Sequence, residues 1–355
     1  MSGLFWVAVG VVLVGAALAD VFYTVLFPGS GRGPVRRPLS RAVTRAFRLA
    51  RRLPSRWRRR TLAYCGPTQV TATLLAWFVL LLGGWAAIYR PALGHAVVAA
   101  TGPTQETWGT ALYFSGYTLT TLGLGDVVAV TPGYRALTVV EAATGFISFT
   151  LVISYFVSVY TTLTARNAFA LGLHQRSGGT GRGVDVVRAL WHEGPTAAAL
   201  HLAAVATELR RLVQTDTSYP VLRSFHYQRD YDALPQMLCT CWETVTLLRT
   251  TVATPASRPE LHGSSVAEIA ASAEEMCSRI VGAPAAADVS TAQRDTWARE
   301  HAGAAEQLVK AGVPVREAGP DAYVAARAGW SNALDALADE LLYDWPSGTK
   351  TSTSS

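Results

Sequence analysis

Three long apolar stretches dominate the first half of the chain, and each contains few polar residues. They cover Leu4–Phe27, Val70–Tyr89 and Ala136–Tyr160. An α-helix rises about 1.5 Å per residue, so about 20 apolar residues cross the hydrocarbon layer of a bilayer. The pattern therefore predicts three membrane-spanning helices. A shorter segment, Trp108–Tyr117, lies between the second and third stretches and predicts a short helix that enters the membrane and returns to the same face.

The second half of the chain shows a different pattern, with apolar residues three or four positions apart. This spacing places side chains on one face of a helix and predicts a buried core stripe. Four such stripes are Leu202, Val205, Leu209, Leu212; Leu234, Leu238, Trp242, Val245; Val266, Ile269, Ala273, Met276; and Trp330, Leu334, Leu337, Leu341. Pro and Gly clusters separate them, so residues 185–346 are expected to form a bundle of about four to six helices without strands. The predicted fold class is an all-α membrane protein, with three transmembrane helices and a re-entrant helix followed by an all-α helical bundle.

The distribution of charge divides the chain in a similar way. Residues 1–165 contain fourteen Arg and four acidic residues, whereas residues 166–355 carry a net charge of −4. The loop from Arg32 to Arg60 holds twelve Arg and no acidic residue. Basic loops beside membrane helices stay in the cytoplasm, which predicts an outside N-terminus and a cytoplasmic C-terminal half. The excess of Arg over Lys favours a bacterium of high genomic GC content, and hence a bacterial plasma membrane.

The first apolar stretch also has a feature of a cleaved signal peptide, because Ala17-Leu18-Ala19 follows an apolar run. However, Met1–Trp6 contains no Lys or Arg, and cleavage would leave the basic loop outside. We therefore interpret residues 1–30 as an additional N-terminal transmembrane helix.

Residues 31–62 combine basic and apolar residues at helical spacing. The basic positions are Arg41, Arg45, Arg48, Arg52, Arg56 and Arg59, and the apolar ones are Leu39, Val43, Ala46, Ala50, Leu53 and Trp57. This pattern predicts an amphipathic helix, kinked near Pro54, that lies on the inner leaflet and binds anionic lipid. Adjacent membrane spans disfavour a nucleic-acid partner. A voltage sensor is disfavoured too, since its arginines lie within an apolar spanning helix.

The segment Thr118–Asp126 reads T-L-T-T-L-G-L-G-D and follows the short helix. Backbone carbonyls can replace the hydration shell of a cation when successive residues point them into one path. Glycine adopts the left-handed angles that this requires without a Cβ clash. We therefore expect the carbonyls of Thr121, Leu122, Gly123, Leu124 and Gly125 to bind the ion. Asp126 would concentrate cations at the outer mouth.

This segment resembles the pore signature of potassium channels, T-x-T-T-x-G-x-G-D, and the resemblance extends over about residues 69–160. It implies a pore domain at residues 63–165, K⁺ as the permeant ion and a homotetramer that passes ions down their gradient. In the family's inner helix, Gly145 corresponds to a gating hinge, with Phe146, Phe149 and Ile153 lining the cavity. A small residue that allows close helix packing is the alternative interpretation of Gly145.

The segment departs from the family at one position that braces the filter. Leu124 occupies the place of a Tyr whose hydroxyl bonds to surrounding aromatic residues, and Phe114 likewise offers no donor. Thr120 and Tyr117 are the expected supporting residues, with the Tyr117 phenol donating to Asp126. Gly-Leu-Gly also occurs in the second pore of two-pore-domain potassium channels. A weakly selective cation channel and a non-conducting membrane-anchored signalling or scaffold protein remain alternatives.

Two carboxylates lie within the apolar stretches, where an ionised group is costly without a partner. We expect Asp20 either to pair with an Arg of the following loop or to remain hydrated near the inner interface. Glu141 is expected to face protein rather than lipid, behind the short helix.

The second half offers several weaker candidates for chemistry. Glycines within His174–Gly183 suggest a nucleotide-binding loop, but no βαβ unit surrounds them, so residues 166–184 are interpreted as a flexible linker. Cys239 and Cys241 with His226 do not have a usual zinc spacing. His192, His201 and His226 are not ordered into a nucleophile and base, which leaves a hydrolytic or pH-sensing site open. We predict no enzyme, no organic cofactor, no metal beyond K⁺, an unknown cytoplasmic ligand or protein, and a disordered tail at residues 347–355.

Overall fold

The structure is a computed structural model of the chain, and its helices confirm the predicted all-α membrane protein. It describes residues 2–27, 33–52, 54–226, 229–253, 255–282, 289–317 and 319–343, with only the backbone for residues 2, 51, 52, 55 and 56. Three helices are long and apolar enough to cross a membrane: Gly3–Leu26, Trp57–Ala92 and Pro132–Arg176. The predicted tail at residues 347–355 lies outside the described residues.

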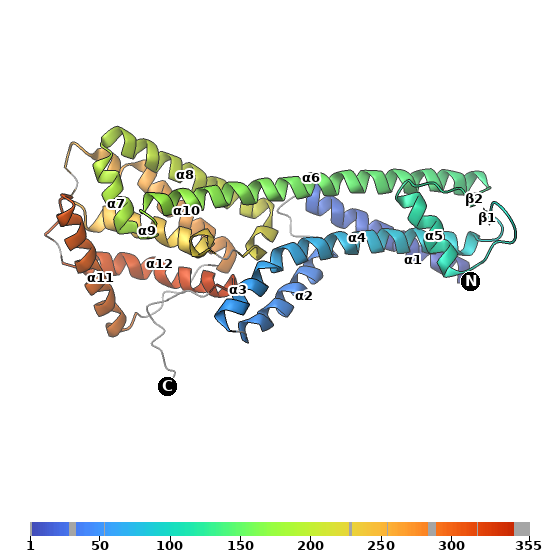
Figure 1. The fold of residues 1–355 in the computed structure, drawn as a ribbon, viewed down its shortest axis with the longest axis horizontal. Coiled ribbons are helices and arrows are strands. Elements are labelled where there is room, and N and C mark those ends of the chain that lie inside the picture. The colour runs from blue at the N-terminus through green and yellow to red at the C-terminus, as the bar shows by residue number, and fades with distance from the viewer. Residues whose placement is uncertain are drawn as a thin grey trace. The chain divides into compact units, whose positions relative to one another are not determined.

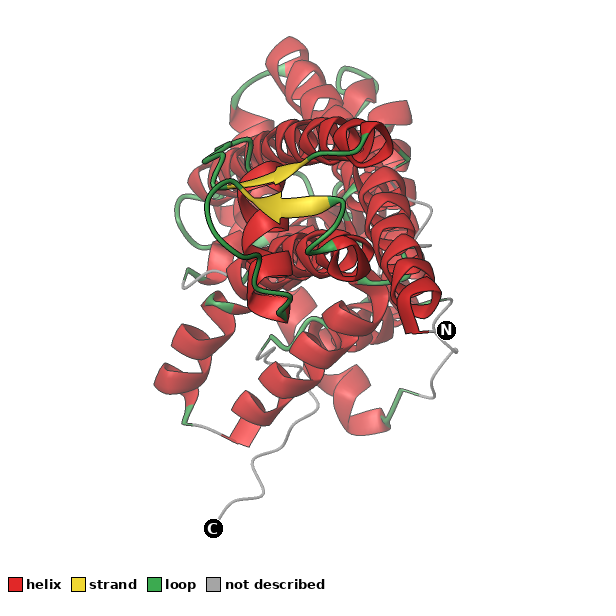
Figure 2. Ribbon diagram, turned by 90° about the vertical axis from the view of Figure 1, so that its right-hand side faces the viewer, coloured by secondary structure: helices red, strands yellow, loops and turns green. Residues whose placement is uncertain are grey.

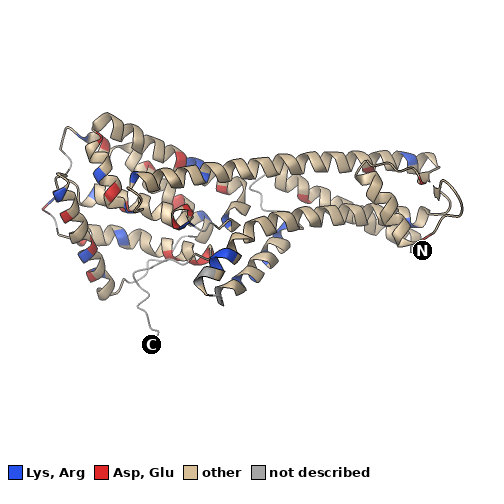
Figure 3. Ribbon diagram, viewed as in Figure 1, with Lys and Arg blue, Asp and Glu red and all other residues tan. Residues whose placement is uncertain are grey.

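The chain divides into two compact units, each described by itself below. The membrane unit comprises Met1–Arg52, Tyr64–Thr161 and Ser218–Phe225, and the C-terminal unit comprises Leu53–Ala63, Thr162–Thr217 and His226–Ser355. Elements of the membrane unit are α1 (Ser2–Val21), η1 (Phe22–Leu26), α2 (Arg36–Arg48), η2 (Leu49–Arg52), α4 (Cys65–Tyr89), η3 (Arg90–Ala92), β1 (Val97–Ala99), α5 (Trp108–Leu119), β2 (Val127–Ala129), η4 (Pro220–Ser224) and the first part of α6 (Pro132–Arg176). Long stretches of α4 and α6 carry no charged residue (Figure 3).

Glycines allow α1 and α4 to pack side by side (Figure 1). A Cβ placed on Gly10 would lie 2.4 Å from the backbone oxygen of Gly84, and one placed on Gly84 would lie 2.8 Å from a methyl of Val14. Small residues at a helix crossing let backbones approach, which is how helices associate in a membrane. The N-terminal helix is thus an integral part of the membrane unit.

Asp20 holds three segments of the membrane unit together. Its side chain is fully buried, and its Oδ1 accepts hydrogen bonds from the backbone N–H groups of Val35 (2.8 Å) and Arg36 (3.1 Å). Its Oδ2 accepts from the indole of Trp77 at 2.7 Å. Both expected environments of Asp20 were therefore wrong. The carboxylate binds the N-terminal N–H groups of α2, where a helix dipole favours negative charge.

A short strand pair lies beside α5, and the sequence analysis did not predict it (Figure 2). β1 and β2 are antiparallel, with Val98 opposite Val128. Ala100 and Val130 extend the ladder. The N–H of Ala100 donates to the backbone carbonyl of Asp126 at 2.8 Å, and the N–H of Val130 donates to the backbone carbonyl of Ala96 at 2.9 Å. The pair joins the segment before α5 to the segment after the glycine-rich motif.

The basic segment contains two separate α-helices, whereas the sequence predicted one helix kinked near Pro54. They are α2 and α3 (Ser55–Ala63). Within the membrane unit, Gln69 of α4 donates to Ser40 of α2 at 2.5 Å, so α2 is fixed against α4. Ser224 donates to the other end of the Gln69 amide at 2.6 Å.

The described residues of the C-terminal unit form helices joined by turns and loops, with one isolated bridge between Val252 and Val315. Its further elements are α7 (Gly183–His192), α8 (Pro195–Ser218), η5 (Asp230–Asp232), α9 (Leu234–Thr250), η6 (Pro259–His262), α10 (Ser264–Val281), α11 (Thr291–Lys310) and α12 (Asp321–Glu340). Every residue of the four predicted stripes is buried in one core, and α9 packs against α7, α10 and α12. The four cysteines are free thiols.

The predicted linker at residues 166–184 is not a flexible connection. Residues 166–176 form the last turns of α6. The glycines that follow adopt positive φ values in a hydrogen-bonded turn, in which Thr240 donates to the carbonyl of Gly181 at 2.7 Å and Thr180 donates to Asp185 at 2.7 Å. The element directly before this turn is the helix α6 and not a strand, so the nucleotide-loop alternative has no structural support.

We predict that Gly10→Ala lowers the Tm of the purified protein, because its Cβ clashes with the backbone of Gly84. Overpacking of this kind costs about 1–3 kcal/mol. Gly15→Ala is the matched control, since it lies on the same helix with nothing within 4 Å of its added Cβ. Equal Tm values for the two variants would show that the α1–α4 crossing does not depend on this contact.

Candidate functional site

We call residues 120–126, which connect α5 to β2, the glycine loop. The first N–H groups of the loop form hydrogen bonds with carbonyls in the C-terminal turn of α5. Thr121 donates to the carbonyl of Thr118 at 2.9 Å, and Leu122 donates to that of Tyr117 at 2.8 Å. Gly123 donates to the same Tyr117 oxygen at 3.3 Å. The N–H groups at the start of the loop therefore bind carbonyls at the end of α5, which would otherwise be free.

Positive φ angles occur at alternate positions of the glycine loop. They are +57° at Thr121, +59° at Gly123 and +79° at Gly125. Leu122 and Leu124 do not have positive φ, so the sign of φ alternates along the loop. Among the described residues, no hydrogen bond is made to the carbonyl oxygens of residues 121–125.

The left-handed angle at Thr121 was missed by the sequence analysis, although it follows the same every-second-residue spacing as the two glycines. A β-branched residue is a genuine outlier in this region, and such strain costs of order 1–3 kcal/mol. Strained backbone persists only where the surrounding structure holds it, and here three amide hydrogen bonds to α5 do so. Thr121 is thus a strained position at the end of the loop next to α5.

The outer end of the glycine loop is held by two tyrosines, and their roles differ from those expected. Asp126 accepts a hydrogen bond from the phenol of Tyr113 at 2.8 Å. Tyr117 donates instead to the backbone carbonyl of Val127, so the predicted Tyr117–Asp126 bond was wrong. Tyr113 lies one helical turn before Tyr117 on the same face of α5, where the helical period could have identified it. Thr120 donates its hydroxyl to Gly116 at 2.8 Å.

Gly145 lies where α6 passes the C-terminal end of α5. A Cβ on Gly145 would come within 1.9 Å of the carbonyl oxygen of Leu119, the last residue of α5. This approach is possible only without a side chain, which supports the close-packing interpretation. α6 remains one continuous helix through this position.

Ser115 links three helices behind the glycine loop. Its hydroxyl lies 2.6 Å from a carboxylate oxygen of Glu141 on α6 and 3.1 Å from the carbonyl oxygen of Leu82 on α4. Glu141 is fully buried, so it faces protein as expected. These contacts join α5 to both flanking helices.

A cavity of about 730 Å³ adjoins the inner end of the glycine loop. Phe146 and Phe149 line it together with Thr121, and both phenylalanines are 65% exposed in the single chain. Ile153 lies further along α6, is 48% exposed and does not contribute to the described lining.

The predicted basic residues fall into different settings. Arg41, Arg45 and Arg48 are exposed on α2. Arg59 belongs to the C-terminal unit, where it forms an ion pair of 2.6 Å with Asp230. The side chains of Arg52 and Arg56 lie outside the described residues.

No group of three potential metal-binding side chains gathers in the part of the chain that the structure describes. Cys241 is buried in the helical core, and burial raises the pKa of its thiol to about 12. His226 lies 2.5 Å from the carbonyl oxygen of Leu341, which accounts for one of its ring nitrogens.

Comparisons with known proteins identify the membrane unit. Residues 73–162 match a family model described as "Ion channel". The uncharacterized membrane protein YdjJ of Bacillus subtilis (strain 168) is 25% identical over 246 residues, which are 69% of this chain and 70% of that protein. No solved structure matches. The chain therefore carries an ion-channel domain over the segment that contains the glycine loop.

We predict that Gly145→Ala lowers the Tm of the purified protein, because the new methyl group displaces Leu119 from α6. Gly172→Ala, on the same helix with nothing within 4 Å, is expected to leave the Tm unchanged or raise it slightly through helix propensity. If Gly145→Ala alters only channel opening and leaves the Tm intact, Gly145 is a hinge rather than a packing site.

Proposed function

We propose that this ion-channel domain is a potassium-selective pore, formed by four copies of the chain around one axis. The alternating left-handed angles at Thr121, Gly123 and Gly125 are the observation that carries the proposal. They leave a row of carbonyl oxygens without protein partners, and such a row can replace the water around K⁺. Conduction is passive and requires neither a catalytic residue nor an organic cofactor.

The exposure of the glycine loop supports a tetramer. Each chain contributes one loop, whereas a ring of carbonyls around an ion needs about four. Leu122 and Leu124 are 65% and 54% exposed in the single chain, although both are apolar. Neighbouring copies around a closed axis would cover these side chains and complete the ring.

Potassium selectivity requires a loop that holds its shape without a tyrosine at position 124. Tyr113 and Tyr117 offer an alternative brace, because their phenols bind Asp126 and the carbonyl of Val127 at the outer end. The strand pair fixes the same end through Ala100. These contacts favour a selective filter over a weakly selective one.

The basic surface of α2 supports the predicted orientation and lipid partner. Three exposed arginines follow one another at helical spacing on α2, and Asp20 and Gln69 fix that helix to the membrane unit. We propose that these three arginines bind anionic headgroups at the inner leaflet. In this proposal the N-terminus lies outside and the C-terminal unit lies in the bacterial cytoplasm.

In planar bilayers with K⁺ on one side and Na⁺ on the other, we expect currents that reverse close to the potassium equilibrium potential. Gly123→Ala and Gly125→Ala should abolish the current, because a Cβ at positive φ distorts the carbonyl row. Gly102→Ala is the matched control, with φ +75° in a loop before α5 and nothing within 4 Å.

Reversal near zero would replace potassium selectivity with a general cation pore. Loss of current in Gly102→Ala as well would mean that any strained glycine unfolds the domain. Absence of current from wild-type protein, with the same oligomer in all variants, would favour the scaffold alternative.

We expect phosphatidylglycerol to raise the Tm of the detergent-solubilised wild-type protein, and the triple variant of Arg41, Arg45 and Arg48 to glutamine to lose most of this increase. Each arginine near an anionic surface contributes about 1 kcal/mol. The control replaces Arg188, Arg210 and Arg211, which are 50–59% exposed in the C-terminal unit. The same lipid response in both triple variants would contradict the assignment of the lipid site to α2.

A further inference from the structure

A cavity of about 570 Å³ lies within the C-terminal unit, between the last turns of α6, the C-terminal end of α7 and the middle of α8. Pockets that bind small molecules have volumes of about 300–1,000 Å³. Nothing in the sequence analysis or in the comparisons assigns a ligand to it.

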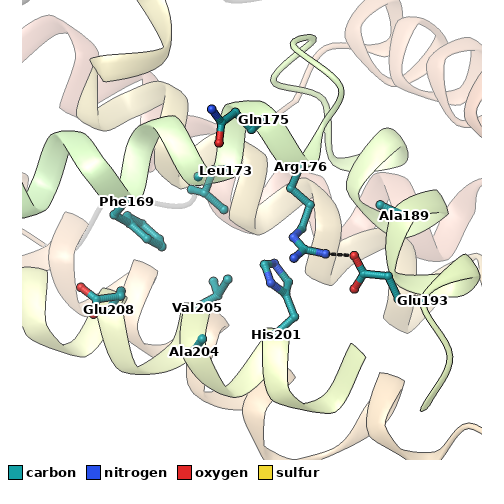
Figure 4. Close-up of a pocket in the computed structure, with 11 residues that line it drawn as sticks. Phe169, Leu173, Gln175, Arg176, Ala189, Glu193, His201, Ala204, Val205 and Glu208 are labelled. Carbon is teal, nitrogen blue, oxygen red and sulfur yellow. Dashed lines mark hydrogen bonds and ion pairs between the residues drawn. The ribbon is translucent and has the colours of Figure 1, made fainter. Parts of the chain in front are cut away.

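The wall of this cavity is apolar along most of its length. Phe169 and Leu173 of α6 face Ala204 and Val205 of α8, and the phenyl ring of Phe169 points into the space between the helices (Figure 4). Such a surface favours a ligand with an apolar body.

The opposite end of the cavity is polar. Arg176 and His201 extend toward each other from α6 and α8, and Arg176 forms an ion pair with Glu193 (Figure 4). That hydrogen bond uses one guanidinium nitrogen, although arginine offers five N–H donors. Nε2 of His201 is buried and has no hydrogen-bond partner in the structure.

His201 can act as a neutral hydrogen-bond donor beside the Arg176 guanidinium. Burial and the Arg176 charge lower the pKa of His201 to about 4, while Glu193 acts in the opposite direction. Hence the imidazole is neutral at pH 7 and can donate a hydrogen bond through Nε2. Glu208, the other acidic residue in the lining, is about two helical turns further along α8, so Glu193 is the acidic residue at the polar end and Arg176 neutralises it.

We propose that this cavity binds a small organic anion, with its negatively charged head on Arg176 and His201 and its apolar body against Phe169, Leu173 and Val205. A charge-assisted hydrogen bond to arginine supplies specificity for the head, and the apolar wall supplies specificity for the body. The ligand would bridge α6 to the α7–α8 pair. Because α6 continues from the ion-channel domain to this cavity, the site gives the chain a ligand-binding element on that helix.

The proposal is tested on the purified full-length protein by isothermal titration at pH 7, with 3-phenylpropionate as the probe. We expect saturable binding with a Kd at or below about 1 mM. The neutral analogue 3-phenylpropanamide and inorganic phosphate should each bind at least about tenfold more weakly, because one lacks the charge and the other lacks the apolar body. Phenyl phosphate, titrated separately, distinguishes a phosphate ester from a carboxylate as the preferred head; saturable binding of either probe supports the proposal.

Two substitutions are expected to act in opposite directions. Arg176→Gln should weaken binding at least about tenfold, whereas Glu193→Gln should tighten it, because it frees the guanidinium from its ion pair. The matched control is Arg210→Gln. Arg210 lies on α8, as His201 does, and is exposed and paired with Glu268. Its replacement should not change the affinity.

Equal affinity for the amide and the carboxylate, or the absence of saturable binding by either anionic probe, would overturn the proposal. So would weaker binding by Glu193→Gln, or equal losses in Arg176→Gln and Arg210→Gln. If Arg176→Gln does not fold, the comparison of wild type with Glu193→Gln decides. This experiment measures no current, so its result is independent of whether the pore conducts potassium.

Discussion

The cost of a polar group without a partner in a membrane determines most of the arrangement described here. Each unsatisfied backbone or carboxylate group in hydrocarbon costs several kcal/mol, so the spans are helices and their buried acids are bonded. Asp20 has three donors and Glu141 has the hydroxyl of Ser115. The carbonyls of residues 121–125 form a consecutive run that no hydrogen bond reaches in the described chain. The proposed pore assigns a dehydrated cation to this run of carbonyls.

An unsatisfied row of carbonyls remains in place only if the rest of the loop is firmly held. The N–H groups of residues 120–123 donate to carbonyls at the end of α5. At the other end of the loop, the carbonyl of Asp126 accepts a hydrogen bond from Ala100, next to the strand pair. α5 is in turn fixed by Ser115 and by the contact between Leu119 and Gly145. The support therefore comes mainly from hydrogen bonds of the backbone and of α5, and a side-chain hydroxyl at position 124 is not part of it.

The sequence predicted those features that depend on one helix at a time. Hydrophobic length identified the spans, and apolar period identified every stripe residue of the C-terminal core. It failed where the partner is distant in the chain. Tyr113 rather than Tyr117 binds Asp126, and the partners of Asp20 are backbone groups of α2 and the indole of Trp77, because tertiary packing decides which donor comes closest. The polar end of the cavity in the C-terminal unit was not predicted for the same reason. Arg176, Glu193 and His201 are distant in sequence, and they line one cavity only because α6, α7 and α8 pack together.

The packing of Gly145 has a consequence for any movement of α6. Helix bends need a position that can give way, and glycine is often chosen for that role. Here the glycine backbone lies directly against Leu119, the residue that precedes the glycine loop. A bend at Gly145 must therefore displace the end of α5, to which the amides of Thr121 and Leu122 are bonded. A movement of α6 at Gly145 would therefore reach the glycine loop through the contact with Leu119.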